Sequence, residues 1–167
     1  MTTLRNNSEN PSLRQLLRSP TLLLAFGFGS GLSPRAPGTV GTLAAIPLWW
    51  LMAQLPLSGY LLIVLVSAIA GIYICGSAAK TLGVHDHGGI VWDEFVGLWI
   101  ALAALPVSWV SLLLGFGLFR LFDILKPWPI SWLDKKVSGG LGIMVDDVVA
   151  GLAAAAVIAL LGVAGLI

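Results

Sequence analysis

The sequence predicts an all-α integral membrane protein, a compact bundle of about four to five membrane-embedded helices. Hydrophobic residues make up 57% of the 167 residues and charged residues only 10%, whereas a soluble domain usually carries about 25% charged residues. Mean hydropathy is +0.95. Three long segments carry no charge at all, and seven of the eight acidic residues lie in short polar segments between them. Acidic groups beside such apolar segments are costly, so we expect them to carry chemistry.

The chain divides into a polar N-terminal tail, residues 1–20, and one membrane-embedded domain, residues 21–167. The stretch Thr21–Leu32 is apolar but short, and no small-residue cleavage site clearly follows it, so we expect it to be retained. The net charge of +1 predicts no nucleic-acid partner. Cys75 is the single cysteine and is expected to be a buried thiol.

The uncharged segments supply the predicted spans, each of which takes roughly 20 apolar residues. Residues 36–79 are long enough for two spans and divide at Pro56-Leu57-Ser58-Gly59. Residues 95–119 contain Pro106 near their centre, and residues 148–167 supply one further span. The total is four spans if residues 95–119 cross once and five if they turn back.

The topology depends on this central segment. A single crossing would split the nine basic residues between the two sides and separate the carboxylates across the bilayer. A reversal at Pro106 places every basic residue on one side, as the positive-inside rule expects for the cytoplasm. Residues 95–105 span only about 16 Å as a helix, so this helix must begin earlier, near Ile90. We favour the reversal, which puts the active site on the cytoplasmic side.

A Gly-rich segment, residues 29–42, leads into the first predicted span and overlaps its start. Glycine lets the backbone approach a ligand closely, and a helix N-terminus offers free N–H groups to an anion. Ser33 and Thr39 add hydroxyl groups and Arg35 adds a positive charge. One interpretation is a phosphate-binding loop. The other is a flexible loop in which Thr39 or Thr42 caps the following helix.

Two predicted helices begin with a pair of adjacent carboxylates, each followed one turn later by a glycine. The pairs are Asp93-Glu94, followed by Gly97, and Asp146-Asp147, followed by Gly151. A small residue at that position leaves room for a neighbouring helix or a substrate. The carboxylates could hold a metal ion, or they could complement the positive end of the helix dipole.

A third polar segment places Arg120, Asp123 and Lys126 on one helical face, because they recur every three residues. Pro127 is expected to end that helix. Arg can grip a phosphoryl oxygen with two N–H groups, and Lys supplies a point charge. Alternatively, the two cations extend toward the membrane surface and form one intrahelical salt bridge.

The remaining polar residues are interpreted as structural. His85 and His87 alternate in a Gly-rich loop and fit no standard zinc pattern, so we expect structural or indirect roles. Asp134, Lys135 and Lys136 are interpreted as ordinary surface charges.

Five carboxylates gathered at one membrane edge would repel one another, and Arg120 and Lys126 cannot neutralise them all. The five are Asp93, Glu94, Asp123, Asp146 and Asp147. A hard divalent cation would neutralise the excess. All-oxygen ligation suits Mg²⁺, which is usually held by carboxylates together with a substrate phosphate.

Taken together, these polar segments resemble the phosphatidylglycerophosphatase A family of bacterial membrane phosphatases. The matching stretches are Gly31-Leu32-Ser33-Pro34, Ala36-Pro37-Gly38-Thr39, Trp92-Asp93-Glu94-Phe95, Arg120 with Asp123 and Lys126-Pro127-Trp128-Pro129, and Gly139-Gly140 through Gly142-Ile143-Met144 to Asp146-Asp147. The resemblance runs in order from about Leu22 to Ile167.

The resemblance implies a Mg²⁺-dependent, multi-pass enzyme of the bacterial inner membrane that converts phosphatidylglycerol phosphate to phosphatidylglycerol in phospholipid biosynthesis. The expected catalytic residues are Asp93, Glu94, Asp123, Asp146 and Asp147, of which Asp93, Glu94, Asp146 and Asp147 would hold the metal. The expected phosphate-binding residues are Arg120, Lys126, Arg35, Ser33 and Thr39. Asp123 would complete the metal site or position the attacking water, and both direct water attack and an aspartyl-phosphate intermediate are open.

Two other functions compete with this prediction: a small divalent-cation transporter and a non-catalytic membrane subunit. A transporter needs acidic residues deep in its spans or on both sides, whereas residues 40–79, 95–119 and 148–167 contain no charge. A non-catalytic subunit would release no phosphate. The predicted partners are the phospholipid substrate and the membrane, and the sequence leaves the oligomeric state open.

Overall fold

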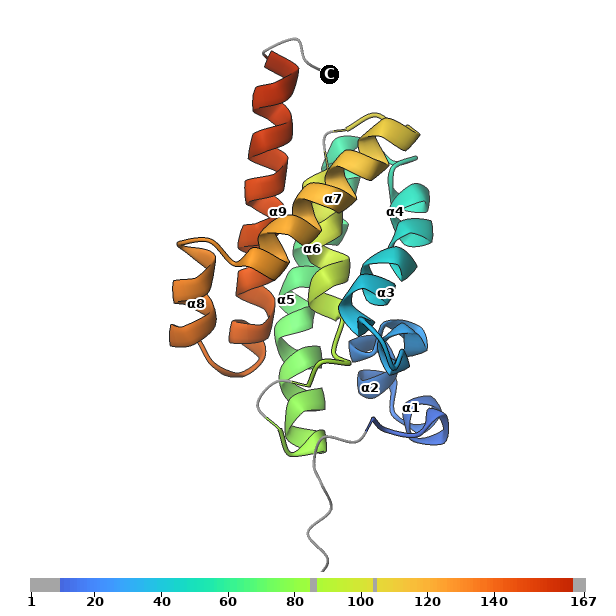
Figure 1. Cartoon of the computed structure of the whole chain (residues 1–167). Coiled ribbons are helices and arrows are strands. Elements are labelled where there is room, and N and C mark those ends of the chain that lie inside the picture. The colour runs from blue at the N-terminus through green and yellow to red at the C-terminus, as the bar shows by residue number, and fades with distance from the viewer. Residues whose placement is uncertain (1–9, 85–86, 104, 164–167) are drawn as a thin grey trace, which may run out of the picture.

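The computed structural model describes residues 10–84, 87–103 and 105–163, which form nine α-helices and one 3₁₀ helix (Figure 1). They are α1 (Leu13–Arg18), α2 (Pro20–Ala25), η1 (Gly27–Leu32), α3 (Pro37–Ala44), α4 (Ile46–Met52), α5 (Leu57–Leu82), α6 (Trp92–Leu102), α7 (Trp109–Leu125), α8 (Ile130–Lys136) and α9 (Gly139–Val163). The described part is therefore all-helical, as predicted.

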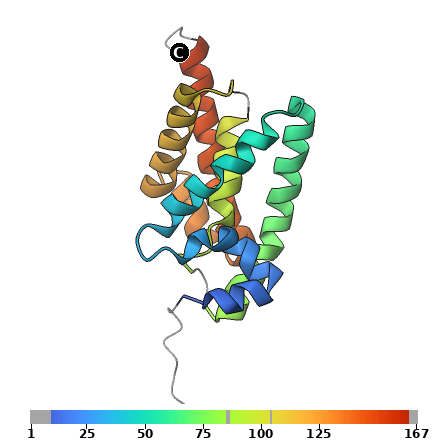
Figure 2. The same cartoon turned by 90° about the vertical axis from the view of Figure 1, so that its right-hand side faces the viewer.

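Helix α6 is the centre of the bundle. It packs against α3, α5, α7 and α9, and its side chains are mostly buried. Figures 1 and 2 show α5, α6, α7 and α9 running along the long axis, with α1 and α2 gathered at one end. A helix that is apolar on every side is stable only when it is surrounded, which explains why this short helix lies inside.

The chain doubles back between α6 and α7, as predicted around Pro106. Gly97, early in α6, lies against Phe119 late in α7, and Leu102 at the end of α6 lies against Gly115. This pairing is that of two antiparallel helices. The Ser108 side chain accepts a hydrogen bond from the Ser111 N–H at 3.0 Å and caps the new helix. The start of α6 and the end of α7 therefore lie at the same end of the bundle.

Two helices in the described residues, α5 and α9, are long and apolar enough to cross a membrane. This number is smaller than the four to five spans predicted. The first expected span is broken at Ala45, because Pro47 near the start of α4 lacks an N–H and crowds the preceding turn. Helix α6 has only 11 residues, so it is shorter than a full crossing requires.

Buried aromatic side chains tie the helices together through their polar atoms. The Trp99 Nε1–H donates to the Ala45 carbonyl at 3.1 Å, and the Tyr60 hydroxyl donates to the Trp99 carbonyl at 2.6 Å. The Trp92 Nε1–H donates to the Ser67 carbonyl at 3.2 Å. Because buried donors need acceptors, these bonds fix α6 against the α3–α4 break and against α5.

Helices α5 and α9 approach so closely that only glycine fits between them. A Cβ atom added at Gly140 would lie 1.8 Å from the Ile72 carbonyl oxygen and 2.8 Å from the Gly76 nitrogen. Nearby, Cys75 is a buried thiol, as predicted, and lies 3.8 Å from the Met144 sulfur.

This close approach predicts that Gly140→Ala destabilises the protein, because the added methyl group forces two backbones apart. We expect a loss of about 1–3 kcal/mol, typical of overpacking, measured as a lower midpoint of thermal unfolding in detergent. Gly117→Ala is the matched control, since nothing lies within 4 Å of a Cβ atom at that exposed helical position; it should be neutral or stabilising. Equal midpoints for the two variants would contradict the prediction.

Candidate active site

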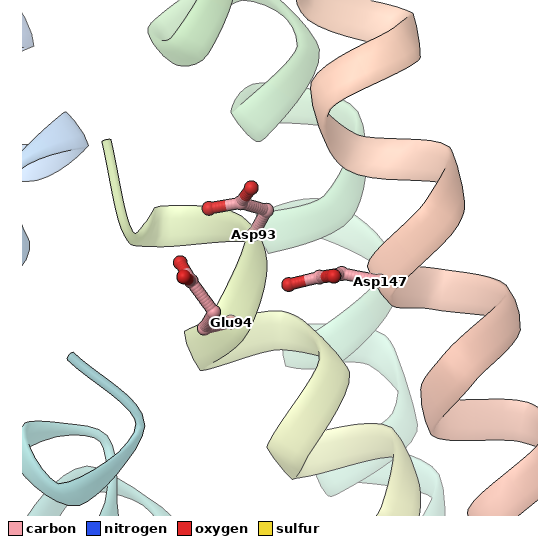
Figure 3. A group of neighbouring side chains, drawn as sticks. All are labelled: Asp93, Glu94 and Asp147. Atoms are coloured by element: carbon pink, nitrogen blue, oxygen red, sulfur yellow. The ribbon is translucent and has the colours of Figure 1, made fainter. Parts of the chain in front are cut away.

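Three carboxylates from two helices meet where α6 begins. Asp93 and Glu94 lie in the first turn of α6, and Asp147 lies on α9. The ligand oxygens of the three all lie within 4.8 Å of one another. Figure 3 shows Asp147 reaching from α9 toward the α6 pair. These three residues are called the carboxylate trio below.

Glycines allow α6 and α9 to approach closely enough for the trio to form. A Cβ atom added at Gly151 would lie 2.4 Å from the Gly97 carbonyl oxygen, and one added at Gly97 would lie 2.9 Å from the Asp147 carbonyl oxygen. The glycine that follows each acidic pair therefore makes room for the other helix. This confirms the interpretation that the small residue accommodates a neighbouring helix.

A cavity of about 180 Å³ lies beside the trio, with walls from the start of α6, the end of α7, α8 and the first turns of α9. Six carboxylates and one ammonium group line it: Asp93, Glu94, Asp123, Asp134, Asp146, Asp147 and Lys126. Carboxylates so close together raise one another's free energy unless cations lie among them. The cavity therefore suits a cation together with a small anionic group.

Arg120 lies near Glu94 and links α7 to α3. Its guanidinium forms an ion pair with Asp123, one turn along α7, and its Nη2 donates to the Thr39 hydroxyl at 3.4 Å. A Cβ atom added at Gly38 would lie 2.4 Å from Glu94 Oε1 and 3.3 Å from Arg120 Nη1. The N-terminus of α3 thus reaches both a site carboxylate and a site cation.

Lys126 ends α7 and holds two carboxylates. Its ammonium lies 2.6 Å from an oxygen of Asp134 on α8 and 2.6 Å from an oxygen of Asp146 on α9. The predicted face of Arg120, Asp123 and Lys126 therefore does point toward one site. The interpretation of an Arg120–Asp123 intrahelical salt bridge also holds, and it does not exclude a role in binding.

The electrostatic environment of the trio disfavours its full ionisation. Burial, followed by the charge of Asp147, raises the pKa of Glu94 to about 8. Burial lowers the pKa of Lys126, but its bonds to Asp134 and Asp146 raise that pKa above its ordinary value overall. At neutral pH Lys126 is therefore charged, whereas the surroundings of Glu94 disfavour its charged form.

The donor set of the trio fits a hard divalent cation. Glu94 Oε2 and Asp147 Oδ2 are buried, and neither accepts a hydrogen bond from any residue that the structure describes. Carboxylate oxygens are the ligands that Mg²⁺ and Ca²⁺ prefer, at about 2.0–2.6 Å. Buried oxygens with no donor and a spacing within 4.8 Å are the arrangement that one such ion would stabilise.

Not every predicted site residue joins the trio. Asp146 bonds Lys126, so its role as a metal ligand stays a prediction. The Ser33 hydroxyl donates to the Arg35 carbonyl at 2.9 Å, and Arg35 is exposed on the loop that leads into α3. Their phosphate-binding roles also stay predictions. Thr39 lies closer to the site, through its contact with Arg120.

The two histidines have different outcomes. His85 lies outside the described residues. His87 is buried; its Nδ1 accepts a hydrogen bond from the Gly89 N–H at 3.0 Å, and its ring lies 5.5 Å from that of Phe26. These contacts hold the loop before α6 against η1, which is the structural role expected for this residue.

Two residues of the site were not identified from the sequence. Asp134 was interpreted as a surface charge, yet it lines the cavity and binds Lys126. Seven residues, two of them prolines, separate it from Lys126, so no helical spacing connects them. Gly38 was placed in the Gly-rich loop, but its contact with Glu94 depends on how α3 packs against α6.

Comparison with known proteins identifies the same family by a family model and by individual relatives. A model of the phosphatidylglycerophosphatase A family matches residues 23–162. Phosphatidylglycerophosphatase A of Escherichia coli is 51% identical over 163 residues, which cover 97% of this chain and 95% of that protein. The protein of the same name in Haemophilus influenzae is 48% identical over 154 residues, covering 90% of this chain and 94% of that protein.

A more distant relative, from Bacteroides thetaiotaomicron, is described as a candidate phosphatidylinositol-3-phosphatase. It is 40% identical over 139 residues, covering 78% of this chain and 86% of that protein. No solved structure matches this chain.

Proposed function

The chain belongs to the phosphatidylglycerophosphatase A family, and on this premise we propose that it hydrolyses the terminal phosphate ester of phosphatidylglycerol phosphate. The products are phosphatidylglycerol and inorganic phosphate. The observation that carries the proposal is the small anionic cavity in which the carboxylate trio faces Lys126. This combination supports the binding of a phosphate group through a cation.

We propose Mg²⁺ as that cation, held by Asp93, Glu94 and Asp147. When bound, it would neutralise the trio and offset the negative charge that develops on the phosphoryl oxygens. Support comes from the buried oxygens of Glu94 and Asp147 that have no donor among the described residues. Asp146 belongs to the predicted ligand set as well, and its second oxygen is also buried without such a donor.

The cationic side chains would hold the phosphate. Lys126 faces the cavity directly, and its charged state is supported by two carboxylates. Arg120 borders Glu94 and is oriented by Asp123 and by the Thr39 hydroxyl. Preorganised donors of this kind favour a transition state in which charge spreads over the phosphoryl oxygens.

The reaction breaks the bond between phosphorus and the ester oxygen of the glycerol headgroup, and water supplies the new oxygen on the released phosphate. A proton passes to the glycerol oxygen as it leaves. Asp123 lines the cavity beside the trio, and in this proposal it orients the attacking water. An aspartyl-phosphate intermediate would need the same water in its second step.

We further propose that α5 and α9 cross the bacterial inner membrane and that the site faces the cytoplasm. Both helices meet the length and composition that a span requires. Their outer faces expose large apolar side chains, including Leu62, Ile69 and Leu160, which water does not favour. Lys80 at the end of α5 and Lys135 on α8 carry the positive charges expected on the cytoplasmic side.

Activity tests the function directly. Purified protein should release phosphate from phosphatidylglycerol phosphate when Mg²⁺ is present, and this release should stop when a chelator is added. Asp147→Asn should lower kcat by about 100-fold or more, because it weakens the binding of the cation that offsets the negative charge of the transition state. Lys135→Gln, at an exposed position on α8, is the control and should retain activity.

Phosphatidylinositol 3-phosphate serves as the comparison substrate, because of the Bacteroides relative's description. A wild-type protein that releases phosphate from that lipid and none from phosphatidylglycerol phosphate would reject the proposed substrate. Equal activity of Asp147→Asn and wild type would reject the trio as the catalytic site.

Labelling of single cysteines tests the topology. In a Cys75→Ala background, Lys80→Cys and Lys135→Cys should react with a membrane-impermeant maleimide only in inverted vesicles. Val107→Cys, exposed in the α6–α7 connection, should react only in right-side-out vesicles. Reaction of positions 80 and 135 from opposite sides would exclude a site that faces one compartment.

A further inference from the structure

Lys126 joins three helices through one ammonium group. It lies at the C-terminal end of α7 with a positive φ of 42°, which turns the chain sharply toward α8. Its Nζ lies 2.6 Å from Asp134 Oδ1 on α8 and 2.6 Å from Asp146 Oδ2 on α9. All three residues line the cavity beside the carboxylate trio.

The two ion pairs of Lys126 differ in their exposure to solvent. The Asp146 side chain is 9% exposed, whereas the Asp134 side chain is 41% exposed. A solvent-exposed ion pair is weak, because water and salt screen it. Separating a buried pair leaves an uncompensated charge and is much more costly. Of the two carboxylates, Asp134 is therefore the one that can leave.

Lys126 has little left to offer a ligand while both carboxylates are bound. An ammonium group carries three hydrogens, and two of them point to Asp134 and Asp146. Two carboxylates on one ammonium also give this group of three residues a net charge of −1. A phosphate dianion that entered the cavity would meet one N–H and a net repulsion.

We propose that Asp134 is a positioning residue and the exchangeable partner of Lys126. While no phosphate is present, the Asp134 carboxylate holds the Lys126 ammonium group toward the cavity. When a phosphoryl group enters, the ion pair between Asp134 and Lys126 breaks and the ammonium group binds the phosphoryl oxygens. Asp146 keeps its bond throughout. When the product phosphate is to leave, the Asp134 carboxylate competes with it for the ammonium group and so favours release. This inference rests on the proposed function, because it assumes that the cavity receives a phosphate monoester.

Binding of inorganic phosphate tests the exchange without any need for turnover. Titration calorimetry is carried out on the purified full chain in detergent, with Mg²⁺ present. Asp134→Asn should bind phosphate about two- to fivefold more tightly than wild type, because the weak, exposed ion pair between Asp134 and Lys126 no longer competes with phosphate. Asp134→Glu should restore wild-type affinity. Thr81→Lys adds the same unit of positive charge at an exposed position on α5 and should leave affinity unchanged.

A double substitution separates exchange from a structural effect. In a Lys126→Met background, Asp134→Asn should no longer tighten phosphate binding, because the shared partner is gone. For the hydrolysis reaction, Asp134→Asn should lower both KM and kcat, as the product leaves more slowly. A merely structural role would lower kcat and leave phosphate affinity unchanged.

Unchanged or weaker phosphate binding in Asp134→Asn would overturn the inference. Two further results would also overturn it: tighter binding that persists in the Lys126→Met background, and the absence of phosphate binding to both wild type and Asp134→Asn. Failure of this inference can be distinguished from failure of the proposed function. Tightened binding in a protein that does not hydrolyse phosphatidylglycerol phosphate would keep the exchange and reject the substrate.

Discussion

Mutual repulsion among carboxylates is the constraint on which the rest of the structure depends. Six of them line one small cavity beside a single ammonium group. The helices that carry the trio are held together by packing, through the contact of Gly97 with Gly151, and by the aromatic hydrogen bonds of α6. The bundle therefore stabilises an arrangement that its own charges oppose, and this stored repulsion is what would give the site affinity for a cation.

The sequence predicted the features that follow from local patterns. An uncharged segment with Pro106 near its centre indicated the reversal between α6 and α7, because only that path gathers the charges on one side. The glycine after each acidic pair indicated the close helix contact. Helical spacing placed Arg120, Asp123 and Lys126 on one face, and all three lie around the site. The last two predictions succeeded because they depend on residues a few positions apart, whereas the reversal follows from the distribution of charge along the whole chain.

Features that depend on tertiary packing were not predictable in this way. Adjacent residues on a helix point in different directions, so Asp147 joins the trio whereas Asp146 contacts Lys126. The sequence pattern gave no reason to assign different roles to the two. Asp134 reaches the site only because α8 folds back against α9. The number of full-length spans was overestimated. Composition does not show that Pro47 breaks the first segment, and α6 was expected to gain length by beginning near Ile90, whereas it begins at Trp92.

The gathering of polar groups at one end of the bundle has a consequence for how the enzyme would meet its substrate. If α5 and α9 span the membrane as proposed, the site opens to one leaflet and meets only the lipids of that leaflet, by lateral diffusion in two dimensions. The effective substrate concentration is then a mole fraction in the bilayer. A lipid phosphate made on the opposite leaflet would have to be flipped across before this protein could act on it.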